Sequence, residues 1–152
     1  MLRQSIKKYL EDHHISYESI PHAAAYSSAQ IAQAAHIPGH KLAKVVMVKL
    51  DGKLTMVALP AHAHLDLHRL KIQSGAKQIQ LASELEFSHE ITDCDPGAMP
   101  PFGELYHMDV WMAESLQHQD WVACNAGTHT DLLKIKAADL LKLIHPKSLP
   151  AC

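Results

Sequence analysis

The sequence contains no long apolar run and no large excess of charge of either sign. No stretch approaches the roughly 18 consecutive apolar residues that indicate a membrane-spanning helix. Fourteen Lys and Arg residues against 16 Asp and Glu residues give a formal net charge of −2 at pH 7. Proteins that bind nucleic acid over a large surface are strongly basic. The composition therefore predicts neither a membrane protein nor a DNA-binding protein, although it is compatible with a small local basic site.

Cysteine is scarce. The chain has only Cys94, Cys124 and Cys152, which are widely spaced and form no CxxC pair. An odd number of isolated cysteines is typical of free thiols in a reducing compartment. The first residues, MLRQSIKKYLEDHH, carry charges where a signal peptide would be apolar. Together these features predict a cytoplasmic protein.

Short motifs of the common enzyme classes are also missing. The sequence has no GxSxG elbow, no GxGxxG, no P-loop and no HExxH. His62, His64 and His68 form an HxHxxxH pattern, and on a strand His62 and His64 would share a face and could bind one metal. No cysteine or carboxylate accompanies them in a ligand pattern, so surface histidines are the alternative. We expect no resident metal and no cofactor.

The remaining composition is that of a globular protein. The 152 residues, 47% of them hydrophobic, suffice for one domain with its own core, and we expect that domain to cover residues 1–152. Hydrophobic periodicity and capping residues predict helices over 2–10, 27–36, 66–74 and 137–144, with a short helix beginning at residue 83. Apolar runs predict strands over 15–20, 43–50, 53–59, 78–81, 104–112, 120–125 and 131–135.

The order of these elements indicates the fold class. Asp51-Gly52 between two apolar runs is typical of a type I′ hairpin. Strands are interleaved with helices, but hairpins occur as well, which is unlike a strictly alternating parallel fold. The pattern therefore predicts an α+β protein with a mixed sheet and helices packed against it.

Lys44 precedes an apolar run, Val45–Val48, that is typical of a central strand covered on both faces. A lysine at the start of such a strand cannot bury its ammonium group without a partner. Two interpretations remain open. The side chain either reaches solvent at the sheet edge, or it is a fixed cation at the mouth of a pocket that binds a phosphate or carboxylate.

The stretch PGAMPPFG, residues 96–103, combines stiff prolines with flexible glycines. Gly97 and Gly103 can turn backbone N–H groups toward a ligand, and successive N–H groups in a fixed loop form an anion or oxyanion hole. The Pro-Pro pair favours an extended path that needs no ordering on binding. Met99 and Phe102 would form an apolar wall. The alternative is a buried turn that Phe102 anchors to the core.

A third stretch, Asn125-Ala126-Gly127-Thr128-His129, joins two predicted strands. A glycine turn followed by a histidine places an imidazole at the end of a sheet. That imidazole could act as a general base or as an orienting donor, and an ordinary loop histidine fits the pattern as well.

Together, these stretches resemble the YbaK/EbsC-type proteins, also called the prolyl-tRNA synthetase-associated or editing domain. The similarity runs from about Tyr17 to the final helix and therefore covers nearly the whole chain. An ordered set of motifs is more specific than any one of them. The matching segments are residues 25–28 with Ala32 and Ala35, then 38–39, 42–46, 59–61, 65–67, 95–103 and 125–129.

The resemblance implies a curved mixed sheet of about six to seven strands surrounded by helices. It also implies a stand-alone trans-editing enzyme, an aminoacyl-tRNA deacylase that hydrolyses the ester of a mischarged tRNA carrying a small amino acid. Its partners would be the acceptor end of an aminoacyl-tRNA and, for delivery, an aminoacyl-tRNA synthetase. A non-catalytic module of the same fold that binds tRNA, a nucleotide or a protein is the alternative.

The resemblance also assigns roles to residues. The family lysine, matched by Lys44, holds a phosphate of the terminal nucleotide, and the family glycine loop cradles the carbonyl and the attacking water. Some members have an asparagine directly after that lysine, where this chain has Val45, so the amino acid that is removed stays open. The expected catalytic residues are Lys44, Gly97, Gly103 and His129, and the expected substrate-binding residues are Tyr26, Met99, Pro100, Pro101, Phe102, Gly127 and Thr128.

Overall fold

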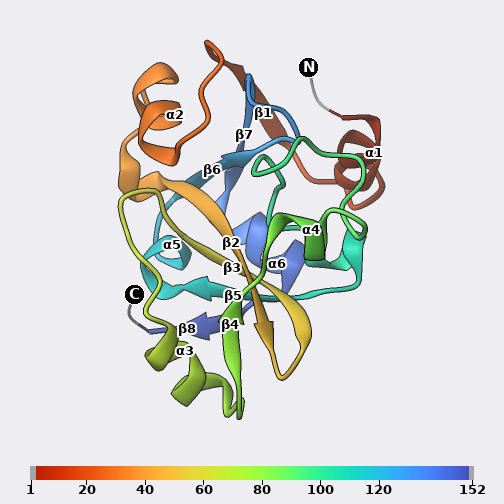
Figure 1. Ribbon diagram of the computed structural model, residues 1–152. Coiled ribbons are helices and arrows are strands. Elements are labelled where there is room, and N and C mark those ends of the chain that lie inside the picture. Colours follow the sequence, from red (N-terminus) through yellow and green to blue (C-terminus); the bar gives the residue numbers. More distant parts are fainter. Residues whose placement is uncertain (1–2, 151–152) are drawn as a thin grey trace.

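A curved, open sheet of eight strands organises residues 3–150, the part of the chain that this computed structural model describes (Figure 1). Its strands lie in the order β1-β7-β6-β2-β3-β5-β8, and β4 pairs with the far end of β2. The β2–β6, β3–β5 and β5–β8 pairs are parallel and the others antiparallel, so the sheet is mixed, as predicted. The strands are β1 (Tyr17–Pro21), β2 (Leu42–Leu50), β3 (Lys53–Pro60), β4 (Ile79–Leu81), β5 (Asp109–Ala113), β6 (Trp121–Asn125), β7 (Asp131–Lys136) and β8 (Lys147–Leu149).

Helices cover both faces of this sheet (Figure 1). One face packs against α2 and α3, and the other against α1, α5 and α6. None of the helices within residues 3–150 combines the length and the apolar character needed to cross a bilayer. The helices are α1 (Gln4–Asp12), α2 (Ser28–Ala34), α3 (Leu67–Ser74), α4 (Glu84–Phe87), α5 (Glu114–Gln117) and α6 (Ala137–Ile144), with 3-10 helices η1 (Gly39–Lys41) and η2 (Gly103–Tyr106).

Local capping signals fix several of these helix ends. Ser27 and Ser83 each cap a helix, and the backbone N–H of each serine donates to the side chain of the residue three positions on, which forms two complete capping boxes. Asp66 accepts a hydrogen bond from the N–H of Arg69 at the start of α3. Gly75 ends that helix in the left-handed region, with φ = 73°.

Three sequence predictions need correction. Residues 104–112 were expected to form one strand, but η2 occupies their first part and β5 begins only at Asp109. The chain turns there because Met108 donates a backbone hydrogen bond to Gly103. The four-residue helix α5 and the three-residue strand β8 were not predicted, and β8 raises the strand count to eight.

The central strand β2 is less completely covered than its apolar sequence predicts. Met47 and Val48 are buried, at 4% and 0% exposure, but Val45 and Val46 are only half-buried. The reason is the strand order on one edge of β2. There β6 pairs with Leu42 and Ala43 and β4 with residues 48–50, so within residues 3–150 no strand covers residues 44–46 on that edge.

The hairpin between β2 and β3 provides a test of local backbone strain. Asp51 and Gly52 both have positive φ, 50° and 82°, as a type I′ turn requires. Since a Cβ at Gly52 would meet nothing within 4 Å, any cost of Gly52→Ala must come from the backbone alone. We expect Gly52→Ala to lower the free energy of unfolding by about 1–2 kcal/mol, measured by urea denaturation.

Gly52→Asn is the matched control, because asparagine tolerates left-handed φ better than alanine does. It should cost clearly less than Gly52→Ala. An equal cost for the two variants would contradict a strain-based explanation of this turn.

Candidate functional site

A tight turn forms the first half of the 95–103 loop. The N–H of Ala98 donates to the carbonyl of Asp95 at 3.0 Å, and Gly97 at the third position has φ = 81°. With Pro96 at the second position, these are the features of a type II turn. Neither the N–H of Gly97 nor that of Met99 donates to any residue within 3–150. Pro96 and Gly97 are exposed, so this turn presents backbone groups to solvent.

Two backbone hydrogen bonds join this turn to the turn after β6. Asp95 donates to the carbonyl of Gly127 at 2.8 Å, and Gly127 donates to the carbonyl of Ala98 at 2.9 Å. The side chain of Asn125 adds a longer bond from Nδ2 to the carbonyl of Gly97 at 3.5 Å. The structure thus brings together two motif segments that lie about 30 residues apart in the sequence.

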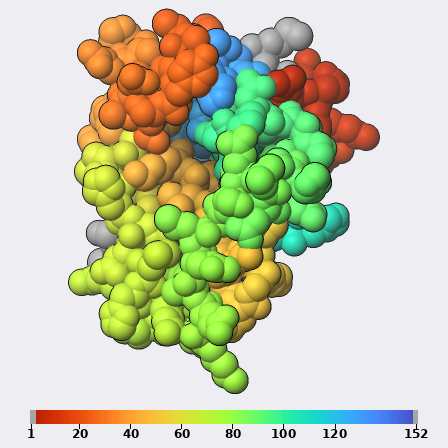
Figure 2. Space-filling view, in the orientation of Figure 1, coloured from red at the N-terminus to blue at the C-terminus, as the bar shows by residue number. Residues whose placement is uncertain are grey.

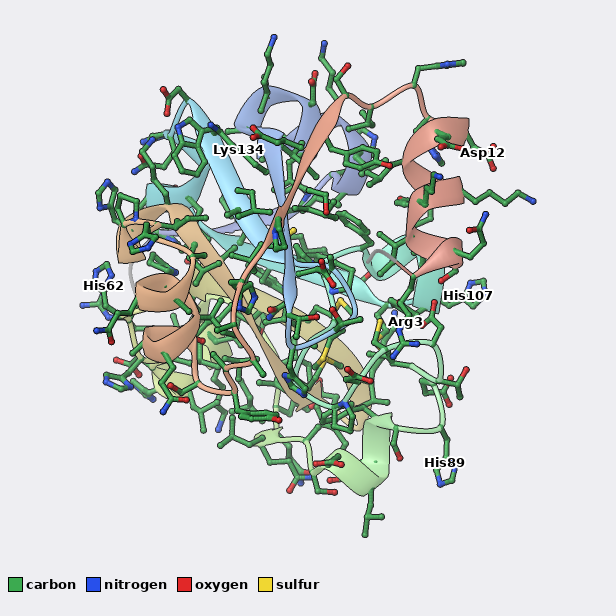
Figure 3. The ribbon with its side chains drawn as sticks, turned by 90° about the horizontal axis from the view of Figure 1, so that it is seen from above. Arg3, Asp12, His62, His89, His107 and Lys134 are labelled. Carbon is green, nitrogen blue, oxygen red and sulfur yellow. The ribbon has the colours of Figure 1, made fainter. Side chains whose placement is uncertain are left out.

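Helix α1 and the residue before it, Arg3, pack against the same region from outside. The guanidinium of Arg3 pairs with Asp95 at 2.8 Å and approaches the carbonyl of Gly127 at 3.5 Å. Figure 3 places Arg3 where α1 meets these loops. A Cβ at Gly127 would lie 2.6 Å from Cγ of Arg3, and Gly127 also has φ = 93°, so only glycine fits there.

Two side chains of α1 make further contacts along the loop. Ser5 donates to Asp93, and Tyr9 donates to Glu104 at 3.1 Å. Burial alone would raise the pKa of Asp93, but hydrogen bonds from Ser5 and Tyr106 outweigh it and hold that pKa below its ordinary value. Asp93 therefore stays ionised and acts as an acceptor for this network.

The second half of the loop turns into the core. Phe102 is fully buried and packs against Tyr9 at a ring distance of 5.5 Å, so its side chain does not reach the surface. Pro100 and Pro101 are buried as well. Gly103 is buried, and a Cβ there would lie 2.2 Å from the carbonyl oxygen of Met108, so only glycine fits. These residues anchor the loop, while Gly97 faces outward.

Lys44 lies half-buried near the start of β2. It follows Ala43, the last residue of β2 that pairs with β6, and it begins the segment that no strand covers on that edge. Figure 2 shows the surface hollowed between the orange segment that carries α2 and the green middle of the chain. Two lysines near Lys44 in the sequence, Lys41 and Lys49, form ion pairs with Asp120 and Glu86.

Tyr26 and His129 border the same region from the other side. Their rings lie 4.7 Å apart in a tilted arrangement, and the N–H of Ala25 donates to the carbonyl of His129. Tyr26 is 72% exposed, which is unusual for so large an apolar ring. Nδ1 of His129 is buried and has no partner within residues 3–150. Thr128 instead turns toward Asp131, to which it donates at 2.8 Å.

The three histidines of the HxHxxxH pattern lie elsewhere. Figure 3 places His62 on the side of the molecule away from Arg3. Within residues 3–150 the structure shows no group of three or more His, Cys, Asp or Glu side chains that could hold a metal. Nothing in the described part of the chain therefore supports the metal alternative.

A small cavity of about 240 Å³ adjoins the turn, between it and α4. Phe87, Ile91 and Met99 make its wall largely apolar, and Pro96 lies at its rim. Cys94 also lines it, and burial raises the pKa of this thiol to about 12. Burial raises the pKa of Cys124 to about 12 as well, so neither thiol is an effective nucleophile at neutral pH.

A family model for the aminoacyl-tRNA editing domain matches residues 22–143. The chain belongs to the aminoacyl-tRNA editing domain family. Residues 3–12, which comprise Arg3 and α1, precede the segment that the family model matches. A comparison with curated protein sequences gives no significant match.

Solved structures share the fold of this editing domain. The hypothetical protein APE2540 superposes with a TM-score of 0.84 at 15% identity, covering 95% of this chain and 97% of its own. A protein described as "a putative trans-editing enzyme for prolyl tRNA synthetase" superposes with a TM-score of 0.82 at 20% identity, covering 99% and 98%. At these identities the likeness concerns the fold, and it confirms the YbaK-like architecture expected from the sequence.

Sequence reasoning missed two residues of the site. Arg3 lies far from every motif, and only the folded chain places it on Gly127 and Asp95. Asn125 was quoted within a motif but given no role, although its side chain links that motif to the carbonyl of Gly97. A polar residue at the end of a buried strand was the one available signal for Asn125, since buried polar groups need partners.

The two loop glycines should respond differently to substitution. Gly103→Ala forces a Cβ against a backbone carbonyl at 2.2 Å, whereas a Cβ at Gly97 meets nothing within 4 Å. We expect Gly103→Ala to cost at least about 3 kcal/mol of unfolding free energy and Gly97→Ala only about 1–2 kcal/mol from its positive φ. Urea denaturation of both variants measures this, and equal losses would contradict the packing role of Gly103.

The buried thiols give a prediction on pH dependence. A thiol with a pKa of about 12 is almost fully protonated at pH 8, with roughly a thousandth of the thiolate of an ordinary cysteine. In a Cys152→Ser variant, we expect Ellman's reagent to react at least about 100-fold more slowly with the folded protein than with the protein in urea. The rate should rise with pH through pH 9, and rapid reaction of one thiol at pH 8 would contradict the raised pKa.

Proposed function

We propose that this chain, acting as one editing domain, is a trans-editing deacylase. It would hydrolyse the ester that joins a small, wrongly attached amino acid to the 3′ end of a tRNA. We place this activity in the cytoplasm, on mischarged tRNA released by a synthetase. The observation that carries the proposal is the exposed turn at Gly97, held rigidly against Gly127 by two backbone hydrogen bonds.

Such a turn suits the chemistry of ester hydrolysis. When water attacks the ester carbonyl, negative charge develops on the carbonyl oxygen, and backbone N–H groups fixed in advance stabilise it. Gly97 is an exposed residue and its N–H donates to no residue within 3–150, so this N–H is available for the purpose. Because both described thiols stay protonated, we assign the role of nucleophile to a bound water molecule.

Other residues would bind the nucleotide. Lys44, beside the uncovered segment of β2, supplies a cation for a phosphate of the terminal nucleotide. Tyr26 offers an exposed ring on which a base can stack, and Gly127, Thr128 and His129 border the site. The apolar cavity beside Met99 offers space for a small side chain. A synthetase needs such a second site because one methylene changes binding by only about 1–3 kcal/mol.

The test is hydrolysis of tRNA specific for proline that carries alanine, serine or cysteine, with wild type and Lys44→Ala. Losing a charge-assisted contact worth about 1.5–3 kcal/mol should lower kcat/KM roughly 10- to 150-fold. Lys71→Ala is the matched control, since Lys71 lies exposed on α3, away from the turn at Gly97, and this variant should retain wild-type activity.

Each outcome has a distinct meaning. Hydrolysis of one mischarged tRNA, impaired by Lys44→Ala and not by Lys71→Ala, supports the editing function and identifies the amino acid. No hydrolysis by wild type across the panel contradicts it. The non-catalytic module that binds tRNA, a nucleotide or a protein would then be the better explanation.

A further inference from the structure

The side-chain oxygen of Asn125, Oδ1, is a buried hydrogen-bond acceptor that no described residue satisfies. Asn125 is the only asparagine of the chain, it ends β6, and the residue is buried, with 7% of its surface exposed. Its Nδ2 donates to the carbonyl of Gly97, which fixes the orientation of the amide. Its Oδ1 is then buried without a hydrogen-bond partner within residues 3–150. Buried acceptors without partners are rare and costly, so this one calls for a ligand or a functional reason.

The position of Asn125 places this acceptor within the candidate site. In the parallel pairing of β2 and β6, Ala43 lies beside Cys124, so Lys44 and Asn125 are the next residues on the two strands. Residues in equivalent positions of neighbouring strands share a face of the sheet, about 4.8 Å apart. The amide of Asn125 therefore lies between the start of the Lys44 segment and the Gly97 turn.

The surroundings of Oδ1 favour a ligand group that donates hydrogen bonds and accepts none. Oδ1 can only accept a hydrogen bond, and so can the carbonyl oxygen of Gly97, to which the same amide donates. An ammonium group carries three N–H donors and no acceptor. In an aminoacyl ester, the α-ammonium group is two bonds from the carbonyl carbon, which the Gly97 turn would hold.

We propose that Oδ1 of Asn125 accepts a hydrogen bond from the α-ammonium group of the aminoacyl ester. This inference rests on the proposed function and deepens it. It assigns to Asn125 the selection of esters with a free amine. Esters with a blocked amine, such as peptidyl-tRNA, lack this charged donor, and the site would leave them intact. The deacylase would thereby remove single wrong amino acids without releasing growing peptides.

The experiment compares two esters that differ at one group. The best mischarged tRNA of the panel is assayed beside its α-hydroxy counterpart, for example alanyl-tRNA beside lactyl-tRNA made by nitrous acid deamination. Both rates are divided by the rate of spontaneous hydrolysis, which removes the intrinsic effect of the ammonium group. The resulting ratio of kcat/KM values, amine over hydroxyl, measures recognition of the amine and cancels general damage to the site.

We expect the wild-type ratio to be about 10 or more, since hydrogen bonds to charged groups are roughly twice as strong as neutral ones. Asn125→Ala should bring the ratio to within about twofold of 1. Asn125→Asp retains an acceptor oxygen and should keep most of the preference for the amine. Thermal unfolding of each variant shows whether it is folded.

Three results would overturn the inference. A wild-type ratio near 1 shows that the amine is not recognised, and it needs no variant. A ratio that stays at the wild-type value in Asn125→Ala, with both rates lowered equally, assigns Asn125 a structural role only. Loss of preference in Asn125→Asp but not in Asn125→Ala contradicts recognition by the oxygen. In each case aminoacyl-tRNA is still hydrolysed, whereas failure of the proposed function is the absence of any hydrolysis.

Discussion

The pair of backbone hydrogen bonds between Asp95, Ala98 and Gly127 is the constraint on which the site depends. It joins a turn from the middle of the chain to a turn between two late strands. Without it, the exposed N–H of Gly97 would have no fixed position relative to β2 and Lys44. Preorganised donors stabilise a developing charge because they need not be reoriented during the reaction. Gly127 must be glycine for a separate reason, since Arg3 packs directly against it.

The loop after Pro96 contains flexible glycine residues, yet its contacts hold it in one conformation. Its first half presents backbone to solvent, and its second half is held by Phe102 in the core and by Gly103 against Met108. Helix α1 adds side-chain contacts to both halves, from Arg3 to Asp95 and from Tyr9 to Glu104. The segment that the editing-domain model matches begins only at residue 22, so this chain supports its site with residues outside that segment.

The features that the sequence predicted correctly are those formed by residues close together in the chain. The capping boxes at Ser27 and Ser83, the left-handed Gly75 and the Asp51-Gly52 turn are all formed by residues within a few positions of one another. Predictions failed where distant contacts decide. The bond from Met108 to Gly103 bends the chain before β5, and the very short β8 exists only because β5 lies beside it.

The same distinction applies to the site. Motif matching identified the glycine turn and Lys44, but it could not show that Phe102 is buried or that Oδ1 of Asn125 has no partner. Both depend on packing between segments that are far apart in the sequence. The order in which the chain is synthesised adds a last consequence. Tyr17 of β1 pairs with Ile135 of β7, so the first strand can join the sheet only after the chain has been synthesised beyond residue 135. The Gly127 turn precedes β7 directly, and the nascent chain therefore has no assembled site until residue 127 has also left the ribosome.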